Sequence, residues 1–411
     1  MHEVGNELTH HVRHNLTLHD ITCDDTYRSV LSALLRDRST PNSTKSIIWA
    51  TAAYANHGVG YAGSDQMTVD TVRHLVSMGE LIPRCEKDAE TQQRRTADKA
   101  EVFTPSWLCN SMINGVEECL FDGQHPFNEE TDEPSGKRSW KTKTAPIFGK
   151  TGNGNGGKND DNDDYDSTDW HEYVSKRCLE ITCGEAPYLT SRYDTVTNKP
   201  IDMEDRIGFF DRKIRVITEN AGSAAERRHA INKALSAIYG FEYQGDNLFL
   251  ARMNMLLTWH EAVTIIDESH NSSDDGWDDI DDMVNAANTI SKNIIQMDGI
   301  TLTVPQREQG GQEPVIETGG SLFELMGGET TGRDNCAYSM DNGNADMPVY
   351  ACIYNRNKRV TFHDLIDGRG RIHMAFDFVI GNPPYHKDGG GATQDSNLRE
   401  VHGGLLRSKG S

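Results

Sequence analysis

The chain of 411 residues is long enough for two or three domains, or for one large α/β domain with an attachment. It contains no run of about 18 apolar residues, and residues 1–30 lack the apolar segment of a secretory signal, so we expect a cytoplasmic protein with no membrane partner. The formal net charge of −22 disfavours contacts with nucleic-acid phosphates, and two explanations stay open: adaptation to high salt, or a basic nucleic-acid-reading part that lies elsewhere.

The cysteines and histidines do not predict a metal site. The eight cysteines include no C-x-x-C pair, and their spacing fits neither a zinc ribbon nor a small disulfide scaffold. We expect scattered reduced thiols and no bound metal. The histidine-rich start, His10, His11, His14 and His19, is more typical of a solvated terminus than of a metal site.

The first part of the chain, residues 1–99, is expected to be a helical N-terminal region. Apolar residues recur at helical spacing in 24–37 and in 67–78, whereas SIIWATAAY at 46–54 fits either a strand or a buried helix. Residues 121–170 are rich in Gly, Asn and Asp, which predicts a long surface loop or disordered insertion.

The second part of the chain alternates strand-like and helix-like segments. Strands are expected near residues 179, 239, 295 and 377, with helices at 224–239 and 247–260, an acidic loop at 268–284 and an insertion at about 304–370. This alternation predicts a mostly parallel sheet in an α/β domain, whose ligands bind beyond the carboxyl ends of the strands. Four polar residues fall at or just after those ends, which predicts a shared site: Glu185, Glu242, Asp298 and Asn382.

The last expected strand runs into the tetrapeptide Asn382-Pro383-Pro384-Tyr385. An amine attached to an aromatic ring or a carbonyl is a poor nucleophile, because its lone pair is delocalised. The side-chain oxygen of Asn382 and the carbonyl of Pro383 can accept hydrogen bonds from such an amine and free the lone pair. The prolines stiffen the loop, and Tyr385 can stack on a flat base that has left the duplex. The pattern predicts methyl transfer to a planar nitrogen, driven by positioning.

With four further motifs, the tetrapeptide resembles the gamma-class N6-adenine DNA methyltransferases, the modification-subunit family of restriction-modification systems. The motifs follow in the family's order: AEVFTPSWLCNSMI (100–113), LEITCGEAPYL (179–189), YGFEYQGDNLFLARMN (239–254) and NIIQMDG (293–299). The resemblance implies an α/β fold with a Rossmann-like S-adenosylmethionine-dependent methyltransferase sheet in residues 100–385. It also implies methyl transfer from S-adenosylmethionine to N6 of adenine in DNA.

The resemblance assigns cofactor contacts outside the glycine-rich loop. Thr104 and Pro105 match the N-terminal motif that opens a helix near the methionine part of S-adenosylmethionine. Glu242 stands where the family has an acid on the ribose hydroxyls, and a carboxylate accepts such hydrogen bonds well. Asp298 stands where the family has an acid on the adenine amine of the cofactor.

The glycine-rich cofactor loop is matched with one departure. Glu180, Cys183 and Gly184 agree with the family's pattern, and Glu185 becomes a candidate contact for the ammonium group of the cofactor. Ala186 replaces the second glycine of the pattern, whose usual role is to let the backbone approach the ligand closely.

The resemblance also implies a missing part. Family members continue after the tetrapeptide with three more strands and a target-recognition domain, whereas residues 386–411 read as an irregular tail. We therefore expect a sheet incomplete at its C-terminal end, with DNA as one partner and a restriction or specificity subunit, or a missing C-terminal half, as another. Two alternatives stay open: a methyltransferase for protein glutamine or RNA, and a non-catalytic remnant or partner subunit.

Overall fold

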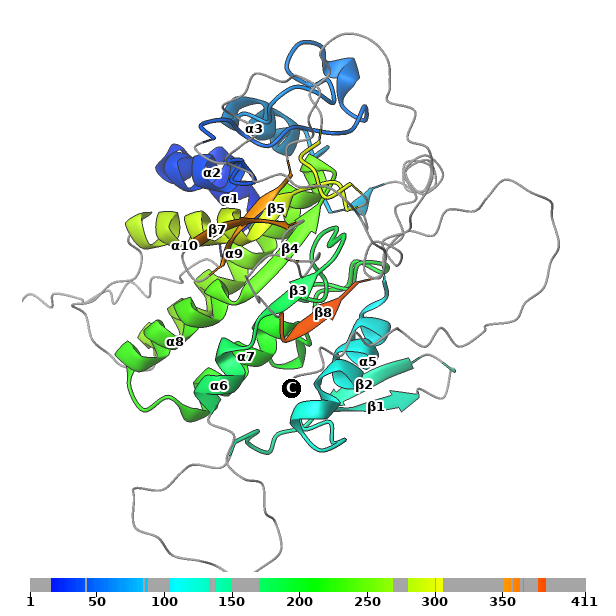
Figure 1. Cartoon of the computed structure of the whole chain (residues 1–411), viewed down its shortest axis with the longest axis vertical. Helices are drawn as coiled ribbons and strands as arrows, with labels where there is room; N and C mark the ends of the chain where they lie inside the picture. The colour runs from blue at the N-terminus through cyan, green and yellow to red at the C-terminus, as the bar shows by residue number, and fades with distance from the viewer. Residues whose placement is uncertain are drawn as a thin grey trace, which may run out of the picture.

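The fold is known from a computed structural model, which describes residues 16–40, 43–83, 86–87, 104–132, 136, 138–148, 170–268, 280–299, 301–305, 350–355, 358–362, 365 and 376–381. Within these ranges the chain is a mixed α/β protein with a parallel four-strand sheet at its centre (Figure 1). No helix in the described ranges has both the length and the apolar character needed to cross a bilayer.

The parallel sheet has the strand order β5-β4-β3-β8. Its strands are β3 (Cys178–Glu180), β4 (Ile238–Glu242), β5 (Ile294–Gln296) and β8 (Phe378–Ile380). Glu180 lies opposite Gly240 of β4 and Ile380 of β8, and Glu242 lies opposite Gln296 of β5. All four strands were expected from the sequence, and because they run parallel, their carboxyl ends meet at one edge.

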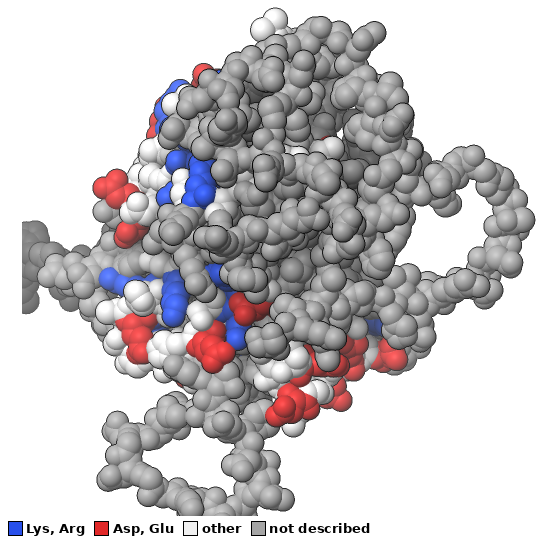
Figure 2. Space-filling model, viewed as in Figure 1, with Lys and Arg blue, Asp and Glu red and all other residues white. Residues whose placement is uncertain are grey.

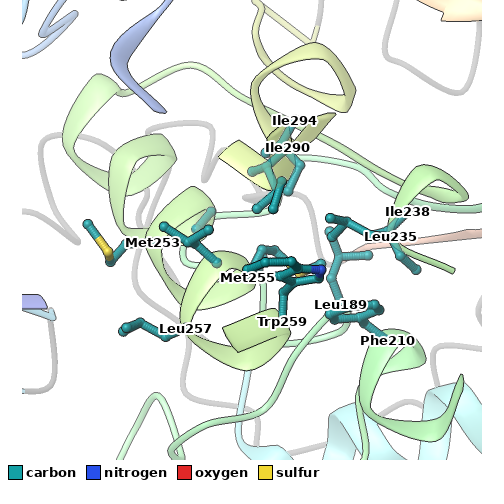
Figure 3. Close-up of a cluster of buried hydrophobic side chains, with 14 of the residues drawn as sticks. Leu189, Phe210, Leu235, Ile238, Met253, Met255, Leu257, Trp259, Ile290 and Ile294 are labelled. Atoms are coloured by element: carbon teal, nitrogen blue, oxygen red, sulfur yellow. The ribbon is translucent and has the colours of Figure 1, made fainter. Parts of the chain in front are cut away.

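Four helices cover one face of this sheet. They are α7 (Phe209–Asn220), α8 (Ala224–Ser236), α9 (Gly245–Glu268) and α10 (Ile280–Asn293). Side chains of α9 lie between the strands and the neighbouring helices, where Trp259 and Met255 pack with Leu235 and Ile290 (Figure 3). This packing explains why α9 is apolar on most sides of its described length, since a helix buried all round needs no polar face.

The other face of the sheet carries a smaller apolar cluster. Leu179, Tyr239, Phe241 and Ile295 point toward this face and pack against an antiparallel hairpin. The hairpin consists of β6 (Cys352–Asn355) and β7 (Lys358–Thr361). Successive strand residues alternate between the two clusters, as the period of two requires.

The N-terminal region contains α1 (Leu18–Cys23), α2 (Arg28–Leu35) and α3 (Val69–Ser77). Capping boxes at Thr17 and Thr68 begin α1 and α3. Arg252 of α9 is fully buried and donates to the carbonyl oxygens of Leu34 and Ile294, so it ties α2 to the start of β5.

The remaining elements are η1 (Asp25–Tyr27), η2 (Ala55–His57), α5 (Ser106–Glu117), η4 (Glu118–Leu120), α6 (Trp170–Ser175) and η5 (Met203–Asp205).

Several sequence expectations are corrected. The expected loop at 121–170 contains an antiparallel hairpin of β1 (Asn128–Asp132) and β2 (Arg138–Thr142), whose largely exposed polar side chains give no apolar alternation. The expected acidic loop at 268–284 ends early, because α10 begins at Ile280. Residues 46–54 form turns and isolated bridges in place of a strand or helix. Of the described cysteines, Cys352 is disulfide-bonded and the others are free.

Candidate functional site at the carboxyl edge of the sheet

The ends of β3 and β8 are in close contact at the carboxyl edge of the sheet. The backbone N–H of Ile181 donates to the carbonyl oxygen of Ile380 at 2.8 Å. A Cβ at Gly381 would lie 2.6 Å from the carbonyl oxygen of Ile181, so no larger residue fits there without a shift. The residues that follow Gly381 in the sequence, Asn382, Pro383, Pro384 and Tyr385, lie outside the described residues.

The turn that follows β3 has an unusual backbone. Thr182, Gly184 and Ala186 have φ angles of 47°, 54° and 64°, in the left-handed region. This region costs an L-residue about 1–2 kcal/mol, and a β-branched residue such as threonine is a true outlier there. Strained backbone of this kind clusters at functional sites. Ala186 therefore keeps the conformation that glycine favours, although it is not glycine.

Glu242 joins this turn to the end of β4. Its Oε2 accepts from the backbone N–H of Gly184 at 3.0 Å, and its Oε1 accepts from the backbone N–H of Gln244 at 3.0 Å. The backbone N–H of Cys183 donates to the carbonyl oxygen of Phe241 at 2.9 Å. Cys183, Gly184 and Glu242, which the sequence nominates separately, are thus held together in space.

Glu180 lies beneath the turn and is only 2% exposed. Its Oε2 accepts from the backbone N–H of Leu189 at 3.1 Å. Burial raises the pKa of this carboxyl well above its usual value and the charge of Glu242 adds to the rise, while backbone hydrogen bonds from Leu189 and Tyr188 oppose it. Burial and the neighbouring carboxylate therefore both disfavour the charged form of Glu180.

Glu185 belongs to a buried polar network that the sequence did not predict. The hydroxyl of Tyr193 donates to Oε2 of Glu185 at 2.7 Å. Nδ2 of Asn254 donates to the carbonyl oxygen of Glu185 at 3.1 Å and to the Tyr193 hydroxyl at 3.0 Å. Asn254 lies in the buried helix α9. A polar residue within such an apolar segment is the sequence feature that could have indicated this network.

Thr104 and Pro105 lie beside the loop that continues from the turn. Pro105 is the N-cap of α5 and has no capping side chain of its own. Asp194 supplies the cap, because its Oδ2 accepts from the backbone N–H of Ser106 at 2.9 Å. Thr195 Oγ1 donates to the carbonyl oxygen of Thr104 at 2.9 Å. Thr104 is therefore not the N-cap of this helix.

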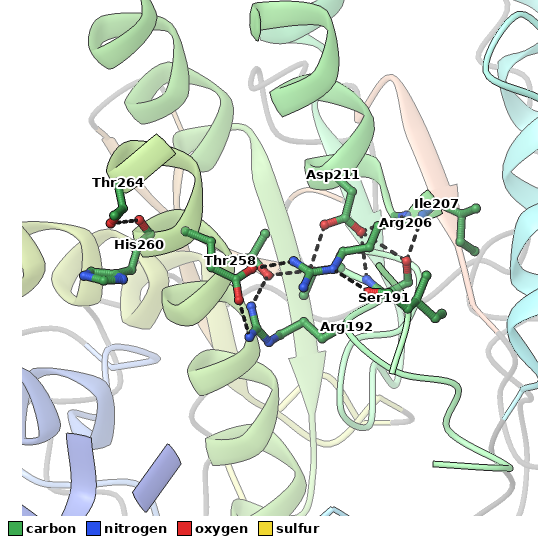
Figure 4. A network of polar contacts seen from close by, with 12 residues as sticks. Ser191, Arg192, Arg206, Ile207, Asp211, Thr258, His260 and Thr264 are labelled. Carbon is green, nitrogen blue, oxygen red and sulfur yellow. Dashed lines mark hydrogen bonds and ion pairs between the residues drawn. The ribbon is translucent and has the colours of Figure 1, made fainter. Parts of the chain in front are cut away.

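The loop of residues 190–207 is itself fixed to the helices (Figure 4). Asp211 of α7 accepts from the backbone N–H of Ser191 at 2.8 Å. Glu261 of α9 binds Arg192 and Arg206, each at 2.6 Å. Burial raises the pKa of Asp211, because the charged form loses its hydration. These contacts hold rigid the segment that positions α5 against the turn.

Asp298 follows β5 and is partly exposed. Its Oδ1 accepts from the backbone N–H of Thr301 at 3.2 Å. A Cβ at the next residue, Gly299, would lie 2.9 Å from Phe241 Cε2 and 3.5 Å from Thr182 Cγ2, so this loop packs closely on the turn after β3. The structure therefore places the candidates that follow β3, β4 and β5 at one turn, with Thr104 and Pro105 beside the loop that continues from it.

Comparisons of the chain with protein-family models, with curated proteins and with solved structures gave no match. Among the residues that the structure describes, no group of three or more His, Cys, Asp or Glu side chains could hold a metal ion.

Proposed function

We propose that this chain is an S-adenosylmethionine-dependent methyltransferase that acts on N6 of adenine in DNA, as part of a restriction-modification system. The observation that carries the proposal is the strand order β5-β4-β3-β8. In chain order these are the third, second, first and fourth strands of the sheet, the order in which doubly wound Rossmann folds begin. Such folds bind their ligand where the order reverses, which here is the junction of β3 with β8.

The motifs of the sequence agree with this position. The strained turn after β3 contains Cys183 and Gly184, and the strand β8 leads into Asn382. These are the two motifs that the proposal needs side by side, since the cofactor loop must meet the residues that hold the target amine. The left-handed φ of Ala186 shows that this position keeps the backbone conformation that glycine would adopt, although Ala186 adds a Cβ.

The described residues fit S-adenosylmethionine in their chemistry. A carboxylate offers about four acceptor positions, so Glu242 can serve ribose hydroxyls while it holds the turn. Asp298 would accept from the adenine amine, and Glu185 would face the ammonium group with its carboxylate oriented by Tyr193. Thr104, Pro105, Glu180, Cys183 and Gly184 would form the methionine side. When bound, the cofactor supplies a methyl group on a positively charged sulfur.

The chain itself would activate and orient the target amine. The side-chain oxygen of Asn382 and the carbonyl of Pro383 would each accept one N–H hydrogen bond and release the nitrogen lone pair. Pro384 would stiffen the loop, and Tyr385 would stack on the flipped base. The barrier would fall mainly because the nitrogen is held in line with the methyl group.

The variant Asn382→Ala tests this assignment. We expect methyl incorporation into adenine to be abolished, because the amine loses an acceptor, while calorimetry gives nearly unchanged affinity for S-adenosylmethionine. Asn285→Ala, on the exposed face of α10, is the matched control and should behave as wild type. A large loss of cofactor affinity in Asn382→Ala would contradict the role given to Asn382.

The substrate is tested separately. Radiolabelled S-adenosylmethionine is offered with duplex DNA, with RNA and with protein, and we expect label in DNA adenine. Label found in RNA or in protein glutamine would identify that molecule, and not DNA, as the substrate. An absence of cofactor binding by the wild-type chain would favour a non-catalytic remnant or partner subunit.

A further inference from the structure

A cluster of cations lies at the amino edge of the sheet, away from the candidate site. Arg36 and Arg38 follow α2, Lys292 lies near the end of α10 just before β5, and Arg359 lies in β7. Lys292 and Arg359 both lie over the ring of Tyr354 of β6, and Arg359 also donates to the carbonyl oxygen of Arg38. We call these four cations the Tyr354 cluster. Figure 2 shows Lys and Arg side chains on the upper left of this face, with acidic side chains nearby.

Structural contacts use only part of the hydrogen-bonding capacity of this cluster. Lys292 Nζ and Arg359 Cζ each lie 5.4 Å from the centre of the Tyr354 ring. Nη2 of Arg38 donates to Oδ1 of Asn288 at 2.5 Å, and Nη2 of Arg359 donates to the carbonyl oxygen of Arg38. The Nε atoms of Arg38 and Arg359 are buried and have no hydrogen-bond partner in the described part of the chain.

The charges in the cluster repel one another. Burial lowers the pKa of Arg38 and of Arg359, and the nearby Arg36 and Arg359 lower that of Arg38 further. The carboxylate that offsets Arg359 is Asp37, whose Oδ1 already accepts from the backbone N–H and the hydroxyl of Ser39.

We propose that the Tyr354 cluster binds phosphate groups of a nucleic-acid backbone. Guanidinium and ammonium groups bind phosphate oxygens through charge-assisted hydrogen bonds, so four cations brought together complement the charge of such a partner. The choice of a nucleic acid rests on the proposed function. Because the cluster lies at the amino edge of the sheet, it would grip the backbone away from the target base and would position the substrate without reading sequence.

The test measures binding of a short fluorescent duplex by anisotropy, with the full chain, between about 0.05 and 0.2 M salt. The variant Arg38→Gln with Arg359→Gln should bind roughly tenfold more weakly, and its plot of log affinity against log salt should be shallower by about two. Lys141→Gln with Lys233→Gln removes the same charge from exposed positions outside the cluster and should stay close to wild type.

Two further variants guard against a folding defect. Lys292→Gln removes a cation for which no hydrogen bond is seen in the described ranges, and it should make the salt dependence shallower by about one. Arg38→Lys with Arg359→Lys keeps the positive charge but removes the planar guanidinium with its paired N–H donors. This variant should keep the wild-type salt dependence of binding while it binds duplex more weakly. Melting curves identify the variants that remain folded.

The proposal is overturned if folded Arg38→Gln/Arg359→Gln binds duplex with wild-type affinity and slope, or if the wild-type chain does not bind duplex at all. Displacement of the duplex by polyglutamate as readily as by polyphosphate would also overturn it, in favour of an acidic protein. Calorimetry with S-adenosylmethionine separates this result from the proposed function. A chain that binds duplex through the cluster but no cofactor refutes the methyltransferase and leaves the cluster's role intact.

Discussion

The turn after β3 shows how single residues set the candidate site. Thr182 and Ala186 adopt positive φ angles within five residues, and Ala186 is fully buried. This conformation is unfavourable for both residues by themselves. The hydrogen bonds from Gly184 to Glu242 and from Cys183 to Phe241 stabilise it. The strain is thus balanced by contacts with β4, and a change at either place affects the other.

Ala186→Val tests the tightness of this turn. A β-branched side chain at a positive φ in a buried position combines backbone strain with overpacking, so we expect a loss of about 2–4 kcal/mol in the free energy of unfolding. Urea denaturation measures it. Ala225→Val, at an exposed position of α8, is the matched control and should cost about 0.5 kcal/mol or less. Equal losses in the two variants would show that the turn is not strained.

Glu180 should make stability depend on pH. Its folded-state pKa is raised, so the folded chain binds more protons than the unfolded chain. The contribution of Glu180 to the free energy of unfolding is therefore fully present below the ordinary pKa of a glutamate in an unfolded chain, about 4.3. That stability is lost as the pH rises through the folded pKa. Glu180→Gln does not titrate, so its melting temperature relative to wild type should rise as the pH increases from about 4 to about 8.

Glu129→Gln, at an exposed position of β1, is the control for this experiment and should show no such trend. A difference between Glu180→Gln and wild type that stays constant with pH would indicate that Glu180 is ionised in the folded chain.

At the scale of elements, the N-terminal region is attached to the sheet at the carboxyl edge. Gln296 at the end of β5 accepts from the backbone N–H of Ile48 at 2.9 Å and donates to the carbonyl oxygens of Ile48 and Tyr243 at 2.8 and 2.9 Å. Gly245 packs against the carbonyl oxygen of Ile48, where a Cβ would clash. The side chain of Gln296 therefore joins the segment around Ile48 to the ends of β4 and β5.

Gln296→Leu tests this attachment. The change keeps the size of the side chain but removes the partner of two buried backbone groups of Ile48 and of the part-buried carbonyl of Tyr243, so we expect a loss of about 3 kcal/mol. Gln66→Leu is the matched control, because exposed Gln66 accepts a hydrogen bond from Ser46 in the same segment, and it should cost about 0.5 kcal/mol. Thermal and urea unfolding measure both. Similar losses would mean that Gln296 holds no essential contact.

At the scale of the whole molecule, the net charge of −22 opposes the compact state. Salt shortens the range of this repulsion, from about 10 Å at 0.1 M to about 3 Å at 1 M. We therefore expect the melting temperature to rise between these concentrations of potassium chloride. A constant or falling melting temperature would show that repulsion does not limit stability and would remove the argument for adaptation to high salt.

The sequence was most informative where the signal is local. The apolar runs that end at Glu180, Glu242, Gln296 and Ile380 predicted all four strands of the sheet, because strand formation there follows from short buried segments. The polar hairpin β1–β2 was missed, since its stability comes from cross-strand pairs and contacts such as Arg215 with the carbonyl of Phe127.

By itself, then, the sequence determined the strands, their order along the chain and the polar residues that follow each strand end. Only the tertiary structure decided that β3 lies between β4 and β8, that Asp194 caps α5, and that Ala186 adopts a left-handed conformation. Hydrophobic period and residue preference act over a few neighbours. The pairing of distant strands, a cap supplied from another loop and a strained φ depend on partners far along the chain, and these exist only once the core has formed.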